Sequence, residues 1–362
     1  MKITSIETFA TSAICMVRVR TDDGAEGWGQ AAPSNADITA TVLHRQVAPQ
    51  ALGADPMEPE ALAERIIESQ YKFPGTYVCR AVGGLDTALW DLRGKVEKKG
   101  VCELLGARPR PLAVYGSSMR RDITPEAEAA RMVRLRDEKG FTAFKIRIGK
   151  RTGQDQDQSP GRTEALIPAI RKALGPAIDL KADANSCYTP GRAIEVGRLL
   201  QEHGYTHFEE PCPYWELDWT AEVAHNLAIP IAGGEQDCFM HIWRRMITLR
   251  AVDIAQPDVG YVGGFSRALR VATMAGAARL PVVPHAANRS MIAVFTLHLL
   301  AAIPNAGPHM EFSIEPGGHE GLYAPALEVK DGRVAVPAGP GWGVTIDPKW
   351  LEKAERKVTE RK

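Results

Sequence analysis

The chain has 362 residues, and its 44 lysines and arginines balance its 44 aspartates and glutamates. This length accommodates one large domain and a smaller one, and the composition is that of an ordinary globular protein. Without a basic stripe or an aromatic platform, nucleic acid is not an expected partner, and no apolar run reaches membrane-spanning length. Six scattered cysteines form no Cys-x-x-Cys pair, and no charged-then-apolar leader opens the chain. We therefore expect a cytoplasmic protein with reduced thiols.

Residues 1–110 are predicted to form a small α+β domain. Alternating runs at residues 3–9 and 14–20 predict two strands, joined through the hairpin signal Asp22-Asp23-Gly24. Residues 84–95 follow with apolar side chains at helical spacing, which predicts a helix with one buried face.

A second hairpin is predicted near the C-terminus. Valines at 329, 334 and 336 surround Asp331-Gly332, within residues 327–344. We expect residues 327–362 to return to the first domain and complete it, which leaves residues 111–326 for the larger domain.

Three acids divide that larger domain at equal intervals. Asp183, Glu209 and Glu235 each close a short β-type run, and 26 residues separate one from the next. A strand, a returning helix and two turns take about that length, so the three acids are expected at the same end of consecutive parallel strands. Carboxylates without a Cys or His suit a hard divalent cation, Mg²⁺ before Zn²⁺.

Alternation within each run predicts which side chains face inward. In the run at residues 207–211, the apolar Phe208 should face the helices, so Glu209 faces inward as a metal ligand and Glu210 points outward. By the same period of two, Lys181 and Asn185 share the face of Asp183. Lys145 and Arg147 likewise share one face, which places cations near the predicted metal.

The period continues beyond the acids and predicts a barrel. Further runs end at Asp258 and at His285, one more carries Glu311, and residues 112–116 form a run in front. Eight βα-type repeats with polar residues at their C-terminal ends predict a (β/α)₈ plan, in which different strands supply catalytic groups to one face.

The predicted side chains suit removal of the proton on the carbon next to a carboxylate. His285 is the candidate base, and Asp258 on the neighbouring strand can accept its other ring N–H. Lys145, Arg147 and Lys181 can stabilise the growing negative charge, and Glu311 is interpreted as a protonated acid. The alternative is a structural network in which Lys145 and Arg147 only pair with Asp183 and Glu209.

In order along the chain, these motifs resemble the mandelate racemase subgroup of the enolase superfamily. The resemblance rests on the helix at 84–95, Lys145-x-Arg147, Asp183-Ala184-Asn185, Glu209-Glu210-Pro211, Gly234-Glu235, Gln256-Pro257-Asp258, Pro284-His285 and Glu311. It implies an α+β capping domain over a modified TIM barrel, (β/α)₇β, and a homo-oligomer. It also implies one Mg²⁺ on Asp183, Glu209 and Glu235, and a His285–Asp258 dyad.

The resemblance further implies where a substrate binds. Asn185 matches a position that contacts substrate in the family. The loop at residues 27–35 is expected to close over the substrate, with Trp28 as a candidate contact; a place for Trp28 in the core of the hairpin is the open alternative. A distal carboxylate would call for a cation of the capping domain, and Lys72 and Arg80 are the possible suppliers.

One departure from the family pattern bears on the reaction. Members with two opposed bases carry Lys-x-Lys, whereas the second position here is Arg147, and guanidinium is a poor base. A lyase that dehydrates a sugar acid to a 2-keto-3-deoxy acid needs only His285, with Lys145 as a weaker candidate base. The alternatives are a racemase, epimerase or cycloisomerase acting on a carboxylate, and a non-catalytic, metal-dependent binder of sugar acids.

Overall fold

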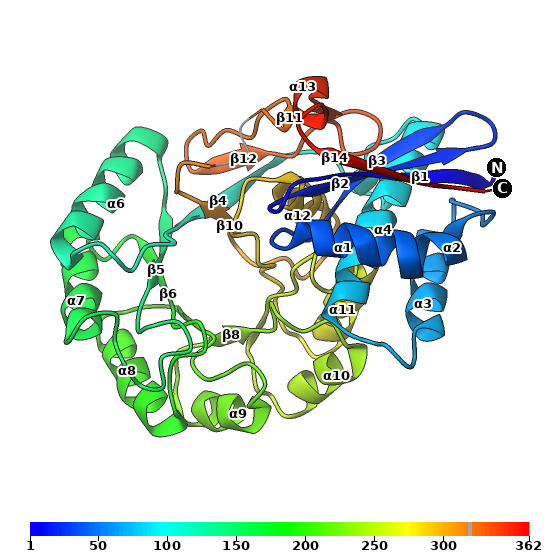
Figure 1. The fold of residues 1–362 in the computed structure, drawn as a ribbon. Helices are drawn as coiled ribbons and strands as arrows, with labels where there is room; N and C mark the ends of the chain where they lie inside the picture. The colour runs from blue at the N-terminus through cyan, green and yellow to red at the C-terminus, as the bar shows by residue number, and fades with distance from the viewer. Residues whose placement is uncertain (318–320, 362) are drawn as a thin grey trace.

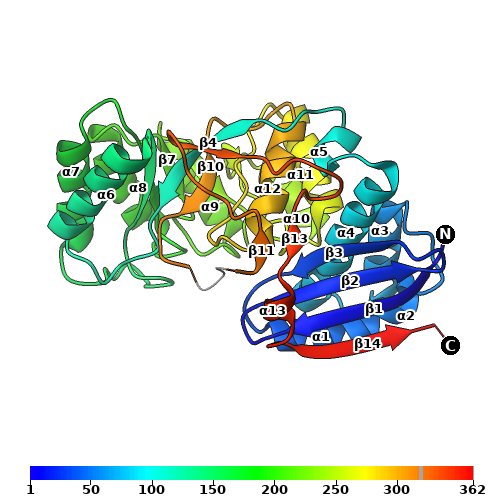
Figure 2. The ribbon, with the colours of Figure 1, turned by 90° about the horizontal axis from the view of Figure 1, so that it is seen from above.

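The computed structural model describes residues 1–317 and 321–361, which form a capping domain beside a barrel (Figure 1). The cap has one antiparallel sheet in the order β14-β1-β2-β3, with both termini at its edge (Figure 2). Its strands are β1 (Ile3–Ala10), β2 (Cys15–Thr21), β3 (Glu26–Ala31) and β14 (Glu355–Glu360). The turn at Asp22-Asp23-Gly24 forms as predicted but joins β2 to β3, whereas residues 11–14 join β1 to β2.

Helices cover one face of the cap sheet. The helix predicted at residues 84–95 lies within α4 (Thr76–Glu97), and its apolar face is buried from Leu85 to Leu92, whereas Val96 is exposed. The other helical segments of the cap are α1 (Ala36–Val42), the π-helical turn η1 (Leu43–Val47), α2 (Ala48–Ala51), α3 (Pro59–Ser69) and α5 (Val101–Leu104).

Strand β3 lies unusually close to α4 because it carries glycines. A Cβ on Gly27 would lie 2.1 Å from the Ala88 carbonyl oxygen, and a Cβ on Gly29 would lie 2.4 Å from the Ala88 nitrogen. Backbone atoms of a helix cannot move aside at low cost, so these positions require glycine. The close contact fixes where the end of β3 emerges over the barrel.

The second domain is the predicted barrel. Its parallel sheet has the order β10-β4-β5-β6-β7-β8-β9. The strands are β4 (Pro111–Ser117), β5 (Ala143–Arg147), β6 (Asp179–Asp183), β7 (His207–Glu209), β8 (Ile231–Gly233), β9 (Ile254–Ala255) and β10 (Met310–Ser313). The seventh predicted run contributes only Val282, which bridges to Ala255 and to Ala306.

Helices surround the barrel strands, as Figure 1 shows. They are α6 (Pro125–Lys139), α7 (Arg162–Leu174), α8 (Pro190–Glu202), α9 (Leu217–Asn226), α10 (Met240–Thr248), α11 (Phe265–Ala277) and α12 (Met291–Ala302). Within the described part of the chain, no helix is long and apolar enough to cross a membrane.

The C-terminal segment differs from the expectation in one respect. The hairpin around Asp331-Gly332 adds β12 (Arg333–Ala335) antiparallel to β4 of the barrel, not to the cap. Its valines find an apolar surface there, since Val334 is buried. The return to the cap is made later, by β14 along β1. Between them lie β11 (Tyr323–Ala324), β13 (Thr345–Ile346) and α13 (Pro348–Leu351).

The contact of β3 with α4 yields a first prediction. Gly29→Ala should lower the free energy of unfolding by about 1–3 kcal/mol, because its methyl group would overlap the backbone of α4. The control Gly191→Ala has no atom within 4 Å of the new Cβ and should leave stability unchanged or slightly higher. Thermal and urea unfolding of both variants would measure the difference; equal midpoints would contradict the close contact.

Candidate active site

A cavity of about 550 Å³ opens at the C-terminal ends of the barrel strands, within the usual range for small-molecule sites. Barrel loops form most of it, and the cap contributes Ala13, Pro33 and Ser34. Of the residues selected from the sequence, Arg147, Asn185, Glu235 and His285 line the cavity. Polar residues therefore meet at the face where barrel enzymes carry their chemistry.

Parallel pairing sets the inner row of charges. In the register of the sheet Arg147 lies beside Asp183, and Asp183 lies beside Glu209. Side chains at paired positions of parallel strands point to the same side, so all three face inward, as alternation predicted. Asp183 and Glu209 are fully buried, and Glu235 follows β8 by two residues.

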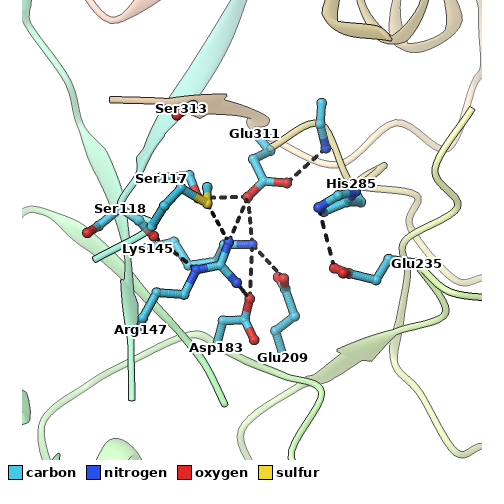
Figure 3. Close-up of polar contacts among 12 residues, drawn as sticks. Ser117, Ser118, Lys145, Arg147, Asp183, Glu209, Glu235, His285, Glu311 and Ser313 are labelled. Carbon is cyan, nitrogen blue, oxygen red and sulfur yellow. Dashed lines mark hydrogen bonds and ion pairs between the residues drawn. The ribbon is translucent and has the colours of Figure 1, made fainter. Parts of the chain in front are cut away.

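Lys145 and Arg147 lie between Glu311 and the pair Asp183 and Glu209 (Figure 3). Lys145 Nζ donates to Glu209 Oε1 at 2.5 Å and to Glu311 Oε1 at 2.8 Å. Arg147 pairs with the Asp183 carboxylate and donates from Nε to the Ser118 carbonyl at 3.0 Å. The ion pairs expected for the alternative structural network are thus present.

The ion pairs hold the buried charges ionised. Burial by itself would raise the pKa of Glu209, but Lys145 and His207 hold it well below its usual range. Burial would lower the pKa of Lys145, whereas Glu209 and Glu311 raise it above its ordinary value. In the metal-free arrangement these ion pairs favour the ammonium form of Lys145.

Glu311 differs from the expectation of a protonated acid. Its Oε1 also accepts from Ser117 Oγ at 2.7 Å, and its Oε2 accepts from the Ala286 N–H at 2.8 Å. Burial raises the pKa of Glu311, but Lys145 and His285 outweigh it and lower the pKa to about 2. In the metal-free protein these contacts favour the ionised carboxyl, which anchors Lys145.

Two carboxyl groups on the side of the cavity at β7 and β8 have oxygens without a hydrogen bond to the described chain, and His285 Nε2 lies 3.7 Å from one of them. Glu210 Oε1 and Glu235 Oε2 are buried and have no hydrogen-bond partner among the residues that the structure describes. Burial raises the pKa of both carboxyls, and the repulsion of Glu235 and Glu209 raises that of Glu210 further. Oxygen atoms in this condition suit a hard divalent cation. Among residues 1–317 and 321–361, however, no three His, Cys, Asp or Glu side chains already have the spacing of a metal site.

The orientation of Glu210 differs from the one that strand alternation predicted. It was expected to point outward with Phe208, yet its side chain lines the cavity. The reason is its backbone, which leaves the strand with φ of 41° in the left-handed region, so the period of two ends at Glu209. Both acids of the pair therefore face the interior.

The His285–Asp258 dyad has the predicted geometry. His285 Nδ1 lies 2.7 Å from Asp258 Oδ2, and Asp258 Oδ1 accepts from the N–H groups of Gly260 and Tyr261. This orients His285 Nε2 toward Glu235, whose Oε2 is 3.7 Å away (Figure 3). Burial lowers the pKa of His285, but Glu235, Asp258 and Glu311 together raise it to about 10.

Of the three predicted substrate contacts, the structure brings only Asn185 to the cavity. Its Oδ1 accepts from Arg121 Nη2 at 2.9 Å and from Arg147 Nη1 at 3.2 Å. Lys181 instead pairs with Asp179 at the opposite end of β6, because the two are neighbours on the same strand face. Trp28 packs on the Phe9 ring at 5.6 Å, in agreement with the hairpin-core alternative.

Sequence reasoning missed several residues of the cavity wall. They lie in loops beyond the strand ends, where no periodicity applies, and include Ala13, Arg151, Tyr214, Trp215, Tyr261 and Asn288. Of these residues, only Tyr261 could have been predicted from the sequence, because it follows Asp258 by three positions. The suggested cap cations do not line the cavity: the Arg80 guanidinium stacks on the Tyr261 ring at 3.8 Å, and Lys72 lies 5.7 Å from the Tyr71 ring.

Comparison with protein families agrees with this architecture. The family model described as "Enolase C-terminal domain-like" matches residues 127–350. The model for the "Mandelate racemase / muconate lactonizing enzyme, N-terminal domain" matches residues 2–106. The chain belongs to the mandelate racemase/muconate lactonizing enzyme subgroup of the enolase superfamily. The fold and family predicted from the sequence are thereby confirmed.

Curated relatives of this enolase-superfamily chain include two kinds of enzyme. It is 30% identical to an arabinonate dehydratase of Saccharolobus solfataricus, over 92% of this chain and 88% of the relative. It is 32% identical to a D-galactarolactone cycloisomerase of Agrobacterium fabrum, over 94% and 90%. The chain is therefore similar to both lyases and isomerases that act on sugar acids or their lactones.

Solved structures add a third description. A candidate racemase from Roseobacter denitrificans superposes with a TM-score of 0.98 at 55% identity, over the whole of both chains. A mandelate racemase/muconate lactonizing protein from Paracoccus denitrificans, complexed with magnesium, superposes with a TM-score of 0.92 at 28% identity, over 99% of this chain and 98% of the other. The chain is thus an enzyme of the superfamily, with lyase and isomerase relatives.

The dyad yields a second prediction. In the metal-free protein, Asp258→Asn should lower the pKa of His285 from about 10, because it removes a carboxylate that raises this pKa. The ring would then lose its proton at lower pH. NMR titration of the His285 ring would measure the shift. The control Asp253→Asn changes a carboxylate just before β9 that accepts a hydrogen bond from the Ile231 N–H, and it should leave the titration unchanged. An unchanged pKa in Asp258→Asn would contradict the coupling.

Proposed function

We propose that the protein is a Mg²⁺-dependent hydro-lyase that dehydrates a sugar acid, an aldonate or aldarate, to a 2-keto-3-deoxy acid. The observation that carries this proposal is the asymmetry of the acid–base groups. His285 faces the cavity with a carboxylate partner at 2.7 Å, whereas the opposite side offers the ion-paired groups Lys145 and Arg147. One base is sufficient for elimination of water.

The cation is assigned to Asp183, Glu209 and Glu235, in keeping with the oxygen-only donors of the inner row. The buried, unpartnered Glu235 Oε2 supports the assignment, and Glu210 Oε1 lies unpartnered on the same side. The magnesium complex of the Paracoccus relative supports the choice of ion. When bound, a divalent cation stabilises the negative charge that develops on the substrate carboxylate.

Positioned protein groups account for the other steps. In the metal-free protein the Glu235 carboxylate raises the pKa of His285, and a cation that balances this carboxylate would leave the ring neutral. His285 Nε2 would then accept the proton from the carbon next to the carboxylate, while Asp258 accepts the Nδ1–H bond and stabilises the imidazolium. Lys145 donates to a carboxylate oxygen as its charge grows. The imidazolium then returns its proton to the hydroxyl group on the next carbon. That C–O bond breaks, water leaves, and the resulting enol becomes the keto acid.

The second candidate is an isomerase that inverts or rearranges a carboxylate substrate. The resemblance to the candidate racemase of Roseobacter and to the cycloisomerase of Agrobacterium favours it. Inversion requires proton delivery to the opposite face, where Arg147 is paired with Asp183 and is a weak acid. The third candidate, a non-catalytic binder, is favoured only by that same arginine.

A third prediction tests the base. With the correct sugar acid and Mg²⁺, the wild-type protein should form a keto acid that reacts with semicarbazide. His285→Asn should reduce the rate by at least about 10²–10⁴-fold, because the amide cannot take the proton. The control His225→Asn, an exposed position on α9, should retain the wild-type rate.

The same assay separates the candidate functions when run in deuterium oxide. Deuterium at C2 with inverted configuration and no keto acid would support an isomerase. Binding without deuterium uptake would support a non-catalytic protein. Keto acid formed at an undiminished rate by His285→Asn would overturn the proposed mechanism.

A fourth prediction tests the ligand assignment by direct binding. Glu235→Gln should weaken Mg²⁺ binding by about 10-fold or more, measured by calorimetry on the chelator-treated protein. Mg²⁺ should also raise the thermal midpoint of the wild type, since it binds the folded state. The control Glu222→Gln, exposed on α9, should bind Mg²⁺ like the wild type. Equal Mg²⁺ affinity in both variants would contradict the assignment.

A further inference from the structure

An uncompensated cation lies at the rim of the cavity. Arg151 lines the cavity and is exposed, and among the residues that the structure describes no carboxylate oxygen lies within 4 Å of its guanidinium. It differs in this from Arg147, which is paired with Asp183. The cation is therefore free to bind an anionic group of a ligand.

Backbone hydrogen bonds hold the loop that carries Arg151. The Thr152 N–H donates to the Asn185 carbonyl at 3.0 Å, and the Asp155 N–H donates to the Cys187 carbonyl at 3.0 Å. The Asp155 carboxylate accepts from the Thr189 N–H at 2.7 Å. The loop after β5 is thus fastened to the loop after β6, next to the substrate-contact candidate Asn185. A tethered loop presents its cation with little loss of backbone entropy on binding.

Positive charge extends behind Arg151. Arg121 donates to Asn185 Oδ1, beside Arg147, and in the described chain it also has no carboxylate within 4 Å. Burial and then the neighbouring Arg147 and Arg151 lower the pKa of Arg121 to about 9. An anionic group of a ligand placed against Arg121, Arg147 and Arg151 would relieve the repulsion among them.

This group lies across the cavity from the base. β5 is the second strand of the barrel, whereas His285 follows the seventh run and Tyr261 follows the sixth. A sugar acid whose α-carbon is at His285 and whose reacting carboxylate lies at the cation proposed on Asp183, Glu209 and Glu235 can extend its chain toward Arg151. The cavity of about 550 Å³ has room for such a chain.

We propose that Arg151 forms a second anion subsite, and that the substrate carries an anionic group at the end of its chain remote from the reacting carboxylate. A terminal carboxylate, as in a hexarate, and a terminal phosphate share this chemistry. The inference rests on the proposed function, because it takes an acid sugar as the ligand. It places the distal cation on a barrel loop and not on the capping domain.

Binding tests the subsite apart from the chemistry. In a His285→Asn background with Mg²⁺ present, calorimetry would compare hexarates, 6-phosphohexonates and hexonates of matched configuration. The doubly anionic ligands should bind about 10- to 100-fold more tightly than the hexonates. The arm with the larger advantage identifies the terminal group as carboxylate or phosphate.

Substitution of the arginine then assigns the preference. Arg151→Gln should remove most of the 10- to 100-fold preference, Arg151→Lys should keep part of it, and the exposed control Arg198→Gln on α8 should keep all of it. Equal binding of singly and doubly anionic acids, or a preference unchanged in Arg151→Gln, would overturn the subsite. Neither result bears on keto-acid formation, so the proposed function stands or fails separately in the assay of His285.

Discussion

The site depends on one buried charge, the ammonium of Lys145. Its side chain is fully buried among three strands. β5 carries it, and the carboxylates of Glu209 on β7 and Glu311 on β10 accept hydrogen bonds from it. Removing one partner of such a buried pair typically costs about 3–5 kcal/mol, since the other charge is left without compensation. The interaction therefore fixes the relative positions of these strands, and with them the carboxylates at the mouth of the barrel.

The cap contributes by position more than by chemistry. Gln30 near the end of β3 donates to Ser290 Oγ at 3.0 Å, and its Oε1 accepts from the Met291 N–H at the start of α12. A second junction joins Asp86 of α4 to Ser266 of α11, through a hydrogen bond of 2.5 Å. The bonds of Gln30 hold the following residues Pro33 and Ser34 at the wall of the cavity, which His285 also lines. The glycines of β3 serve the same end, because they let the strand lie against α4.

The sequence was informative wherever a regular period operated. The spacing of Asp183, Glu209 and Glu235 placed them on consecutive strands, and alternation within β5 turned Lys145 and Arg147 inward. It was uninformative where the backbone leaves the strand. Glu210 faces the cavity because of its left-handed φ.

Other predictions were wrong because the periodic pattern of a strand does not specify which residues will contact it. Lys181 lies on the predicted face, but the nearest carboxylate is Asp179 at the far end of its strand. Trp28 lies on the face of β3 that packs on Phe9, away from the cavity. The seventh run was predicted to be a strand, but only its Val282 forms bridges to neighbouring segments. A run of apolar residues does not specify whether neighbouring strands will pair with it. Loop residues such as Arg151 follow no period, so only the folded chain places them at the cavity.

The acidic residues on one side of the cavity and the arginines on the other are complementary in charge. On the side of β7 and β8, Glu210 and Glu235 retain oxygens that no protein donor satisfies, whereas Arg121 and Arg151 near β5 lack carboxylate partners within the described residues. A folded protein rarely keeps unsatisfied carboxyl oxygens and unpaired arginines on two sides of one cavity, because each disfavours the compact state. A divalent cation on the acidic side and a ligand with an anion at each end would satisfy both. The same ligand would then span from the metal and His285 to the arginines, which is how remote binding groups position a reacting carbon against its base.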